Sequence, residues 1–240
     1  LFQGSMAGST LLERRVDNIA KLRKAAADPV GSILIGFNKN WDSFARIKPP
    51  SVRKLVISTP CKRPIWIEYL NGRGRVHLER VGIKPNERII TYILSSMCTN
   101  GWLKSPDDFP ILFDETLKIL GETCPETTIV IKPHPATLPS NIDLQRDIMK
   151  RHTNSNIVYA HINPMLLAFQ SKFFISNGYS STFLMAKESG VPTIEYTDPC
   201  DEILLATNGG SMRPDMVDHF IRRDPSQLQI VLKKLLKSSD

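Results

Sequence analysis

Short apolar segments alternate with amphipathic segments through the second part of the chain. The apolar segments are rich in β-branched residues and do not alternate with polar positions, which is typical of parallel strands buried on both faces. They predict strands at 88–94, 127–132, 157–159, 172–176 and 192–196. Between them, apolar residues recur three and four positions apart, which indicates helices. The predicted helices lie at 109–122, 142–152, 164–170 and 180–189, with two closing helices near 214–223 and 225–237. This order predicts an α/β fold with a doubly wound, Rossmann-like parallel sheet.

The pattern before residue 85 is less regular. Thr10 and Glu13 form a capping box, which predicts that a helix begins there and runs to Ala27. The other predicted elements are strands at 32–37 and 54–58, a helix that starts at Pro64, and a turn or loop at 71–74.

A change of composition near residues 82–86 indicates a domain boundary. Residues 1–5 look like the remnant of an engineered protease site. We therefore predict a tag remnant at 1–5, a short N-terminal helix and partial α/β region at 6–84, and a Rossmann-like domain at 85–240.

Composition narrows the class of protein. The 240 residues carry 31 Lys+Arg against 24 Asp+Glu, a net charge of +7, and are 41% hydrophobic, as is usual for a folded chain. No apolar segment approaches the ~18 residues that span a bilayer, and no secretory signal follows Met6. The four cysteines lack Cys-x-x-Cys spacing, which favours reduced thiols over a zinc site or disulfides. We therefore expect a cytoplasmic protein.

The excess of positive charge is typical of a protein with an anionic partner, but it does not identify which kind of anion is bound. A nucleotide, an acidic glycan and a membrane surface are the alternatives. Nucleic-acid binding is disfavoured because no motif interleaves aromatic and basic residues. Lysines near the end of the last helix favour contact with the helix dipole over docking to a membrane, so any membrane contact is expected to be peripheral, at the inner face.

Ligands of such sheets bind at the carboxyl ends of the strands. Four loops follow strands of the main domain there, at 95–101, 132–135, 160–163 and 176–182. Together they bring a lysine, two histidines and several hydroxyls to one edge of the sheet. The candidate binding residues are Ser95, Ser96, Lys132, His161, Asn163, Ser176, Asn177, Ser180, Ser181 and Thr182.

Two of these loops have a clear physical rationale. Ser180 or Ser181 is expected to cap the following helix, whose free N–H groups and positive dipole end would form an anion cradle. The alternative is an ordinary helix cap without a ligand. His134 lies between two prolines that hold its backbone extended, which suits an imidazolium aimed at a phosphate. The alternative for His134 is a surface or internally bonded histidine.

These motifs resemble the C-terminal, nucleotide-binding domain of GT-B glycosyltransferases. The similarity is to the bacterial capsule and surface-polysaccharide group, which includes CMP-sugar transferases and CDP-glycerol glycerophosphotransferases. The segments that carry it are Ile129–Pro135 with its His-Pro motif, Phe174–Thr182 with Tyr-Ser-Ser-Thr, Gly190–Tyr196, Ile162–Leu166 and Thr59–Tyr69.

The resemblance implies a fold of the GT-B C-domain type and roles for matched residues. In these families the His-Pro histidine contacts the nucleotide phosphate and helps the nucleotide to leave, and the serine motif holds the phosphate. Carried over, this puts His134 at the leaving phosphate and Ser180, Ser181 and Thr182 around it. Glu195, at the end of the last predicted strand, is a candidate for the ribose hydroxyls, with a surface carboxylate as the alternative.

The sequence also departs from the family pattern. Only about 80 residues precede the main domain, where a GT-B enzyme has a second Rossmann-like domain that binds the acceptor. Asp108 is the candidate general base, although acidic residues also open helices for dipole reasons alone. No Asp-x-Asp metal motif occurs, so we expect no cofactor and a metal-independent reaction. Arg213, after a glycine-rich loop, is a less favoured candidate for a phosphate contact.

The leading hypothesis is an enzyme that transfers a sugar or glycerol phosphate from a CMP- or CDP-linked donor to a surface-polysaccharide acceptor. Its expected partners are the nucleotide-sugar donor and a glycan or lipid-linked acceptor. The alternative is a nucleotide-binding module that depends on a partner subunit or on a homodimer to complete the cleft.

Overall fold

The computed structural model describes most of the second part of the chain and two short strands of the first. The described residues are 33–36, 54–57, 64–84, 87, 89–94, 103–105, 107–134 and 139–237. The chain divides into two compact units, Leu1–Pro64 and Ile65–Asp240. The boundary that the sequence predicts between residues 84 and 85 stays a prediction.

In the first unit, two short strands pair in parallel. β1 (Ile33–Gly36) lies beside β2 (Lys54–Ile57), with Ile33 opposite Lys54. Both strands were predicted from their apolar runs, and both are confirmed. The helix predicted from Thr10 to Ala27 lies outside the described residues.

The second unit is built on a six-stranded sheet in which every pairing is parallel. Its strands are β3 (Ile89–Ile93), β4 (Thr128–Lys132), β5 (Ile157–Tyr159), β6 (Ser171–Ser176), β7 (Thr193–Thr197) and β8 (His219–Arg222). Their order across the sheet is β5-β4-β3-β6-β7-β8. The order reverses between β3 and β6, as in doubly wound nucleotide-binding folds. The predicted α/β, Rossmann-like fold is confirmed.

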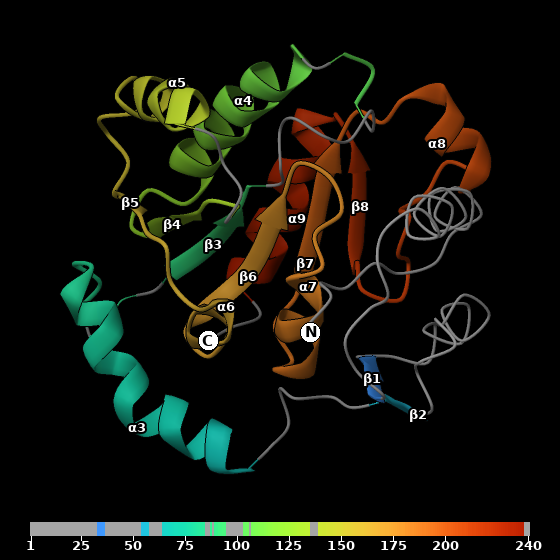
Figure 1. The fold of residues 1–240 in the computed structure, drawn as a ribbon. Helices are drawn as coiled ribbons and strands as arrows, with labels where there is room; N and C mark the ends of the chain where they lie inside the picture. Colours follow the sequence, from blue (N-terminus) through green and yellow to red (C-terminus); the bar gives the residue numbers. More distant parts are fainter. Residues whose placement is uncertain are drawn as a thin grey trace. The chain divides into compact units, whose positions relative to one another are not determined.

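Helices cover both faces of this sheet (Figure 1). They are α3 (Pro64–Arg80), α4 (Asp108–Thr123), α5 (Pro139–Met149), α6 (Pro164–Ala168), α7 (Phe183–Glu188), α8 (Asp201–Ala206) and α9 (Pro225–Lys237). One face packs against α4, α5 and α9, with Tyr92 and Ile175 in its core. The other packs against α3, α6 and α7, with Ile93 and Phe174 in its core.

One irregularity lies between β3 and β6. Ile89 is opposite Ser171, but Thr91 is opposite Phe174, so β6 holds one residue more than β3 over this stretch. An extra residue of this kind is a β-bulge, and it changes which residues of the strand face each side. The hydroxyls of Thr91 and Ser171 are 2.6 Å apart beside it.

A predicted turn at 71–74 is wrong, because α3 continues through it to Arg80. Gly74 is buried in this helix, and a Cβ built on it would lie 2.5 Å from Cδ2 of Leu166 in α6. Leu70 and Leu78, one turn away on either side, are also buried. The glycine therefore belongs to the buried stripe of the helix, where its small size permits close packing.

The end of the chain also differs from its prediction. The segment near 214–223 was predicted to be a helix, but it contains the edge strand β8. Only Ile221 of this strand is buried, so its four residues carry no strand-like alternation. The short helix α8 was not predicted. The last helix, at 225–237, is confirmed as α9.

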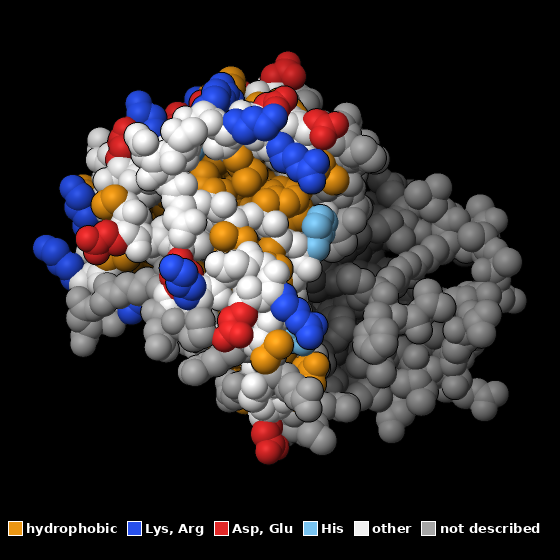
Figure 2. Space-filling model, turned by 90° about the vertical axis from the view of Figure 1, so that its left-hand side faces the viewer, with side chains coloured by type: hydrophobic (Ala, Val, Ile, Leu, Met, Phe, Trp, Pro, Cys, Tyr) orange, Lys and Arg blue, Asp and Glu red, His pale blue; other side chains and the backbone are white. Residues whose placement is uncertain are grey.

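Figure 2 shows hydrophobic side chains gathered in the middle of one face, with charged side chains of both signs around them.

In the described part of the chain, the helices are all too short or too polar to cross a membrane.

Candidate functional site

One row of residues crosses four strands at the carboxyl edge of the sheet. Lys132 at the end of β4 is opposite Ile93 of β3, Ile93 is opposite Ser176 of β6, and Ser176 is opposite Glu195 of β7. Residues paired in this way point to the same face of a parallel sheet. Ile93 packs in the core on the α6 and α7 face, so Lys132, Ser176 and Glu195 share that face. The sequence alone did not decide whether Lys132 faces the site or the opposite side of the sheet, and the pairing puts it on the face of Ser176 and Glu195.

The point where the strand order reverses lies between β3 and β6 in this row. Open α/β sheets bind ligands in the crevice at such a point, outside the carboxyl ends of the strands. The loop after β6, residues 177–182, lies there. Two of the predicted site residues in the loop after β3, Ser95 and Ser96, fall outside the described residues.

Asn177 ties this loop to the interior of the domain. Its amide nitrogen donates to Thr116 Oγ1 at 3.0 Å and to the carbonyl oxygen of Tyr196 at 2.9 Å. Its amide oxygen accepts from the hydroxyl of Tyr92. Asn177 is 2% exposed, so it anchors the loop from the interior. The sequence had marked it only as a candidate binding residue.

The hydroxyl part of the loop leads into α7. Helix α7 begins at Phe183, and its cap residue Thr182 makes no side-chain capping bond. Ser180 Oγ accepts the Thr182 N–H at 3.3 Å, and the Ser180 carbonyl accepts the Phe183 N–H at 3.0 Å. Ser180 thus bonds an N–H of the turn that leads into α7, whereas the cap position of the helix itself is Thr182. The turn at 180–183 is tight, and α7 has only six residues. Ser180, Ser181 and Thr182 are half-buried.

Lys132 and His134 follow one another at the end of β4. Lys132 is buried, with Nζ donating to the Pro133 carbonyl at 3.4 Å, and burial lowers the pKa of its ammonium. His134 is half-buried, and burial together with the charge of Lys132 lowers the pKa of the imidazole. The unliganded protein therefore favours neutral His134 at neutral pH. A bound anion would raise that pKa, because an opposite charge favours the protonated imidazole.

His161 and Asn163 follow β5, the edge strand beside β4. The Ala160 N–H donates to the Ile131 carbonyl at 3.0 Å, so the ends of β4 and β5 stay paired just before the two predicted histidines. His161 is exposed, and its ring lies edge-on to Tyr159 at 5.9 Å. Asn163 caps α6, because its side chain accepts the Met165 N–H at 2.9 Å. This contact gives Asn163 a structural role.

Glu195 is 4% exposed, so it is not the surface carboxylate that the sequence left as the alternative. Ser211 Oγ donates to its Oε2 at 2.5 Å. Burial raises the pKa of Glu195 to about 7, and the bond from Ser211 offsets only part of that effect. Near neutral pH the carboxyl therefore populates both forms and can accept or donate a hydrogen bond.

A buried arginine lies on the same segment as Ser211. Arg213 donates from Nε and Nη2 to the carboxylate of Asp215, at 2.7 and 2.5 Å. Its guanidinium is 5.9 Å from the ring centre of Tyr179, in the loop after β6. The sequence marked Arg213 only weakly and missed Ser211, Tyr179 and Asp215. An Arg-x-Asp spacing just after the Gly-Gly-Ser loop was the available signal.

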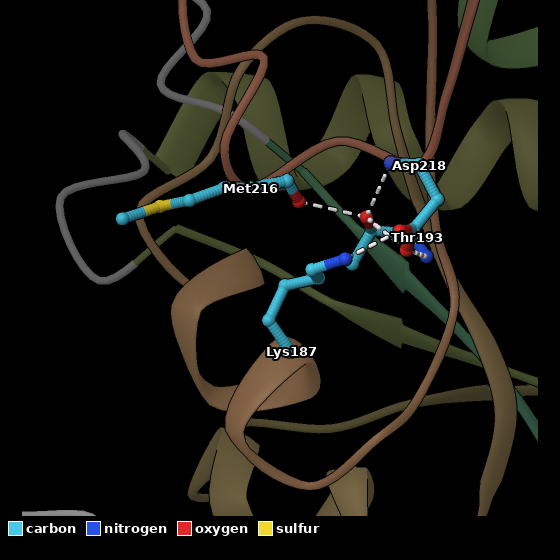
Figure 3. A network of polar contacts seen from close by, with 4 residues as sticks. All are labelled: Lys187, Thr193, Met216 and Asp218. Atoms are coloured by element: carbon cyan, nitrogen blue, oxygen red, sulfur yellow. Dashed lines mark hydrogen bonds and ion pairs between the residues drawn. The ribbon is translucent and has the colours of Figure 1, made fainter.

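The other end of this segment is fixed to the start of β7 (Figure 3). Thr193 Oγ1 donates to the Met216 carbonyl at 2.7 Å, and the Thr193 N–H donates to Asp218 Oδ2 at 2.9 Å. Lys187 of α7 forms an ion pair with Asp218. The segment 211–218 is thus bonded to β7 at both Glu195 and Thr193, and we call it the strap.

Asp108, the candidate base, is the first residue of α4. Its Oδ2 accepts the Ser105 N–H at 2.7 Å, which is a local bond at the start of the helix. This bond gives the carboxylate the structural role that the sequence offered as the alternative. Within the described ranges, no three His, Cys, Asp or Glu side chains are grouped so as to hold a metal ion.

The chain is similar in structure to the wall teichoic acid polymerase TagF. The TM-score is 0.53 at 18% identity for one TagF structure, over 99% of this chain and 56% of that one. For a histidine variant of TagF the TM-score is 0.55 at 19% identity, over 99% of this chain and 55% of that one. A weaker likeness, with a TM-score of 0.40 and 15% identity, is to WaaG, a glycosyltransferase involved in lipopolysaccharide biosynthesis, over 94% of this chain and 59% of that one. No protein-family model matches the chain, and no curated protein matches it. The likeness to TagF supports the predicted Rossmann-like fold of the GT-B type.

Proposed function

We propose that this chain is the donor-binding part of a transferase that uses a nucleotide-activated donor. The group transferred is a sugar or glycerol phosphate, the nucleotide is CMP or CDP, and the acceptor is a surface polysaccharide. The observation that carries the proposal is the row of Lys132, Ser176 and Glu195 beside the point where the strand order reverses. The fold likeness to TagF, whose printed description is a wall teichoic acid polymerase, supports the same class.

In this proposal His134 neutralises the phosphate that leaves. The imidazole is neutral in the free protein and gains a proton when the anionic donor binds, because the phosphate outweighs the repulsion from Lys132. Ser180, Ser181 and Thr182 surround the phosphate with hydroxyl donors. Glu195 binds the ribose hydroxyls, a role that a buried carboxyl with a pKa near 7 can fill in either protonation state.

The reaction is a direct displacement. A hydroxyl of the acceptor forms a bond to the transferred group while the bond from that group to the nucleotide phosphate breaks. The acceptor proton passes to a base, for which Asp108 stays the candidate, and the negative charge that develops on the departing phosphate is stabilised by His134. We propose that protein groups do this without a metal ion.

A second candidate is a nucleotide-binding module that works with a partner subunit or a second copy. The chain spans 56% of the length of the TagF chain. The two candidates differ in one respect that can be measured: the enzyme consumes donor, whereas the module binds nucleotide and leaves it intact.

The proposal is tested by thermal unfolding of the protein with CMP, CDP, UDP, GDP or ADP. A ligand at about 100 times its dissociation constant adds ~2.7 kcal/mol of stability. A shift confined to CMP and CDP supports the proposed donor, and a shift with UDP or GDP alone changes the donor. Absence of a shift with every nucleotide overturns the proposal. Donor consumption in the presence of candidate acceptors then separates the enzyme from the module.

A further inference from the structure

Arg213 holds a hydrogen-bond donor that the surrounding protein does not use. The residue is 2% exposed, and two of its guanidinium nitrogens are bonded to Asp215. The third, Nη1, is buried and has no partner among the described residues. Buried polar groups nearly always have a hydrogen-bond partner, and an unmet donor on a charged group is especially costly. An acceptor atom of a ligand would satisfy the hydrogen-bonding capacity of Nη1.

The guanidinium is held in place before any ligand binds. Asp215 binds one edge of it through two hydrogen bonds, and Tyr179 faces it at 5.9 Å. Ser211 Oγ accepts the Arg213 N–H at 3.1 Å, so the backbone is also fixed. An arginine that is already ordered loses little conformational entropy when it binds a ligand.

A second unused donor lies on the strand that pairs with Glu195. Ser211 Oγ joins the backbone of Arg213 to Glu195, and Glu195 is opposite Ser176 in the sheet. Ser176 is fully buried, and its Oγ likewise has no partner in the described part of the chain. Glu195 is thus bonded to the segment of Arg213 and opposite Ser176 in the sheet, and Tyr179, three residues after Ser176, faces the arginine at 5.9 Å.

We propose that Arg213 Nη1, together with Ser176 Oγ, binds an oxygen of the phosphate group of the nucleotide donor. A charged donor and a hydroxyl match the chemistry of a phosphate, which carries negative charge and several acceptor oxygens. Asp215 does not compete for that oxygen, because it occupies the other two nitrogens and its own side chain is 55% exposed. This inference rests on the proposed function and adds the strap to the donor site.

The test separates the phosphate from the rest of the nucleotide. The affinities of the full chain for CMP and for cytidine are measured by titration, and then for the uridine, guanosine and adenosine pairs. Arg213→Gln is expected to weaken nucleotide binding by about 10- to 100-fold, as for the loss of a charge-assisted hydrogen bond, and to leave nucleoside binding unchanged. Arg222→Gln is the matched control, because Arg222 is 51% exposed and pairs only loosely with Asp198 at 3.7 Å. It is expected to change neither affinity.

Equal weakening of nucleotide and nucleoside by Arg213→Gln, or no weakening of either, overturns the inference and leaves Arg213 a structural residue. If Arg213→Gln does not fold, Ser176→Ala gives the same comparison with an expected loss of about 2- to 10-fold, confined to the nucleotide. An unmodified protein that binds no nucleotide overturns the proposed function itself, whereas binding without a phosphate-specific loss overturns only the role of Arg213.

Discussion

Ser176 and Glu195 lie opposite each other on neighbouring parallel strands, and both side chains are buried on the face of the sheet that α6 and α7 cover. Within the described residues, Ser176 Oγ has no partner, while Glu195 accepts a hydrogen bond from Ser211 in the strap. The pair therefore combines an unused hydroxyl with a carboxyl of unusually high pKa. Both properties arise from burial, and both can be tested.

Glu195 is expected to make stability depend on pH. Its pKa is about 7 in the folded protein against 4.5 for an ordinary carboxyl, so the folded state holds a proton that the unfolded state has lost between those values. Stability therefore falls as pH rises from 4.5 to 7, by about 3 kcal/mol for this group. Glu195→Gln removes that dependence.

The measurement is urea unfolding of Glu195→Gln and the unmodified protein at intervals across this range. The difference between the two curves isolates Glu195 from other titrating groups. Parallel curves at all pH values would show that Glu195 titrates normally.

His134→Ala is expected to reduce transfer by about 10²- to 10⁴-fold, the usual contribution of a positioned acid or base, while the melting temperature changes little. The matched control is His152→Ala. His152 lies away from the proposed site, with Nε2 2.8 Å from Asp114, so this variant should retain transfer activity. Initial rates with a saturating donor provide the readout. Equal rates for the unmodified protein and His134→Ala would remove His134 from the mechanism.

Binding of the nucleotide should also take up a proton at His134. Because the pKa of the free imidazole is lowered and a bound phosphate raises it, the affinity is expected to rise as pH falls towards the free pKa and to level off below it. Calorimetry in two buffers of different ionisation enthalpy measures the proton uptake directly. A His134→Ala variant with the same proton uptake would contradict the assignment.

Asn177→Ala is expected to destabilise the domain by about 2–4 kcal/mol, because it leaves the buried Tyr92 hydroxyl and Thr116 hydroxyl without a shared partner. Tyr92→Phe should cost less, since it removes one of the two groups without leaving a charged or unmet donor. Denaturant unfolding of both variants and of the double variant gives the coupling energy. Strictly additive effects would show that the two side chains do not interact.

Two glycines of α3 provide a matched pair. A Cβ on Gly72 meets nothing within 4 Å, so Gly72→Ala should stabilise the helix by about 0.5–1 kcal/mol. A Cβ on Gly74 would lie 2.5 Å from Leu166 Cδ2, so Gly74→Ala should lose that gain and destabilise the protein by about 1 kcal/mol. Chemical denaturation compares the two. Similar stabilisation by both would show that α3 and α6 are not closely packed at Gly74.

Three strands of the sheet were predictable because they are buried along their whole length. β3, β4 and β7 are buried at every position, and the apolar residues that fill most of these positions predicted them. The regular order of strands and helices then predicted the Rossmann-like fold. The edge strand β8 escaped prediction because only Ile221 of its four residues is buried, and a short amphipathic segment suits a helix equally well.

The candidate site was predictable only in part, for a physical reason. The carboxyl-end rule placed Lys132, Ser176 and the hydroxyl loop together from the strand order alone. It could not identify Ser211 or Arg213, because the strap reaches Glu195 by returning along β7 after α8 and has no periodicity of its own. It also could not distinguish a residue that binds a ligand from one that anchors the loop, as Asn177 does.

The bulge between β3 and β6 fixes which residues of β6 face the site. Successive residues of a strand face opposite sides, and beyond the single extra residue in β6 it is Ser176, and not Ile175, that shares a face with Glu195. Deleting Lys172 would remove the bulge and still leave Phe174 opposite Thr91 and Ser176 opposite Glu195, so the hydroxyl would keep its face. A homologue aligned with a gap at this position would therefore be expected to keep the serine hydroxyl on the same face as the carboxyl of Glu195.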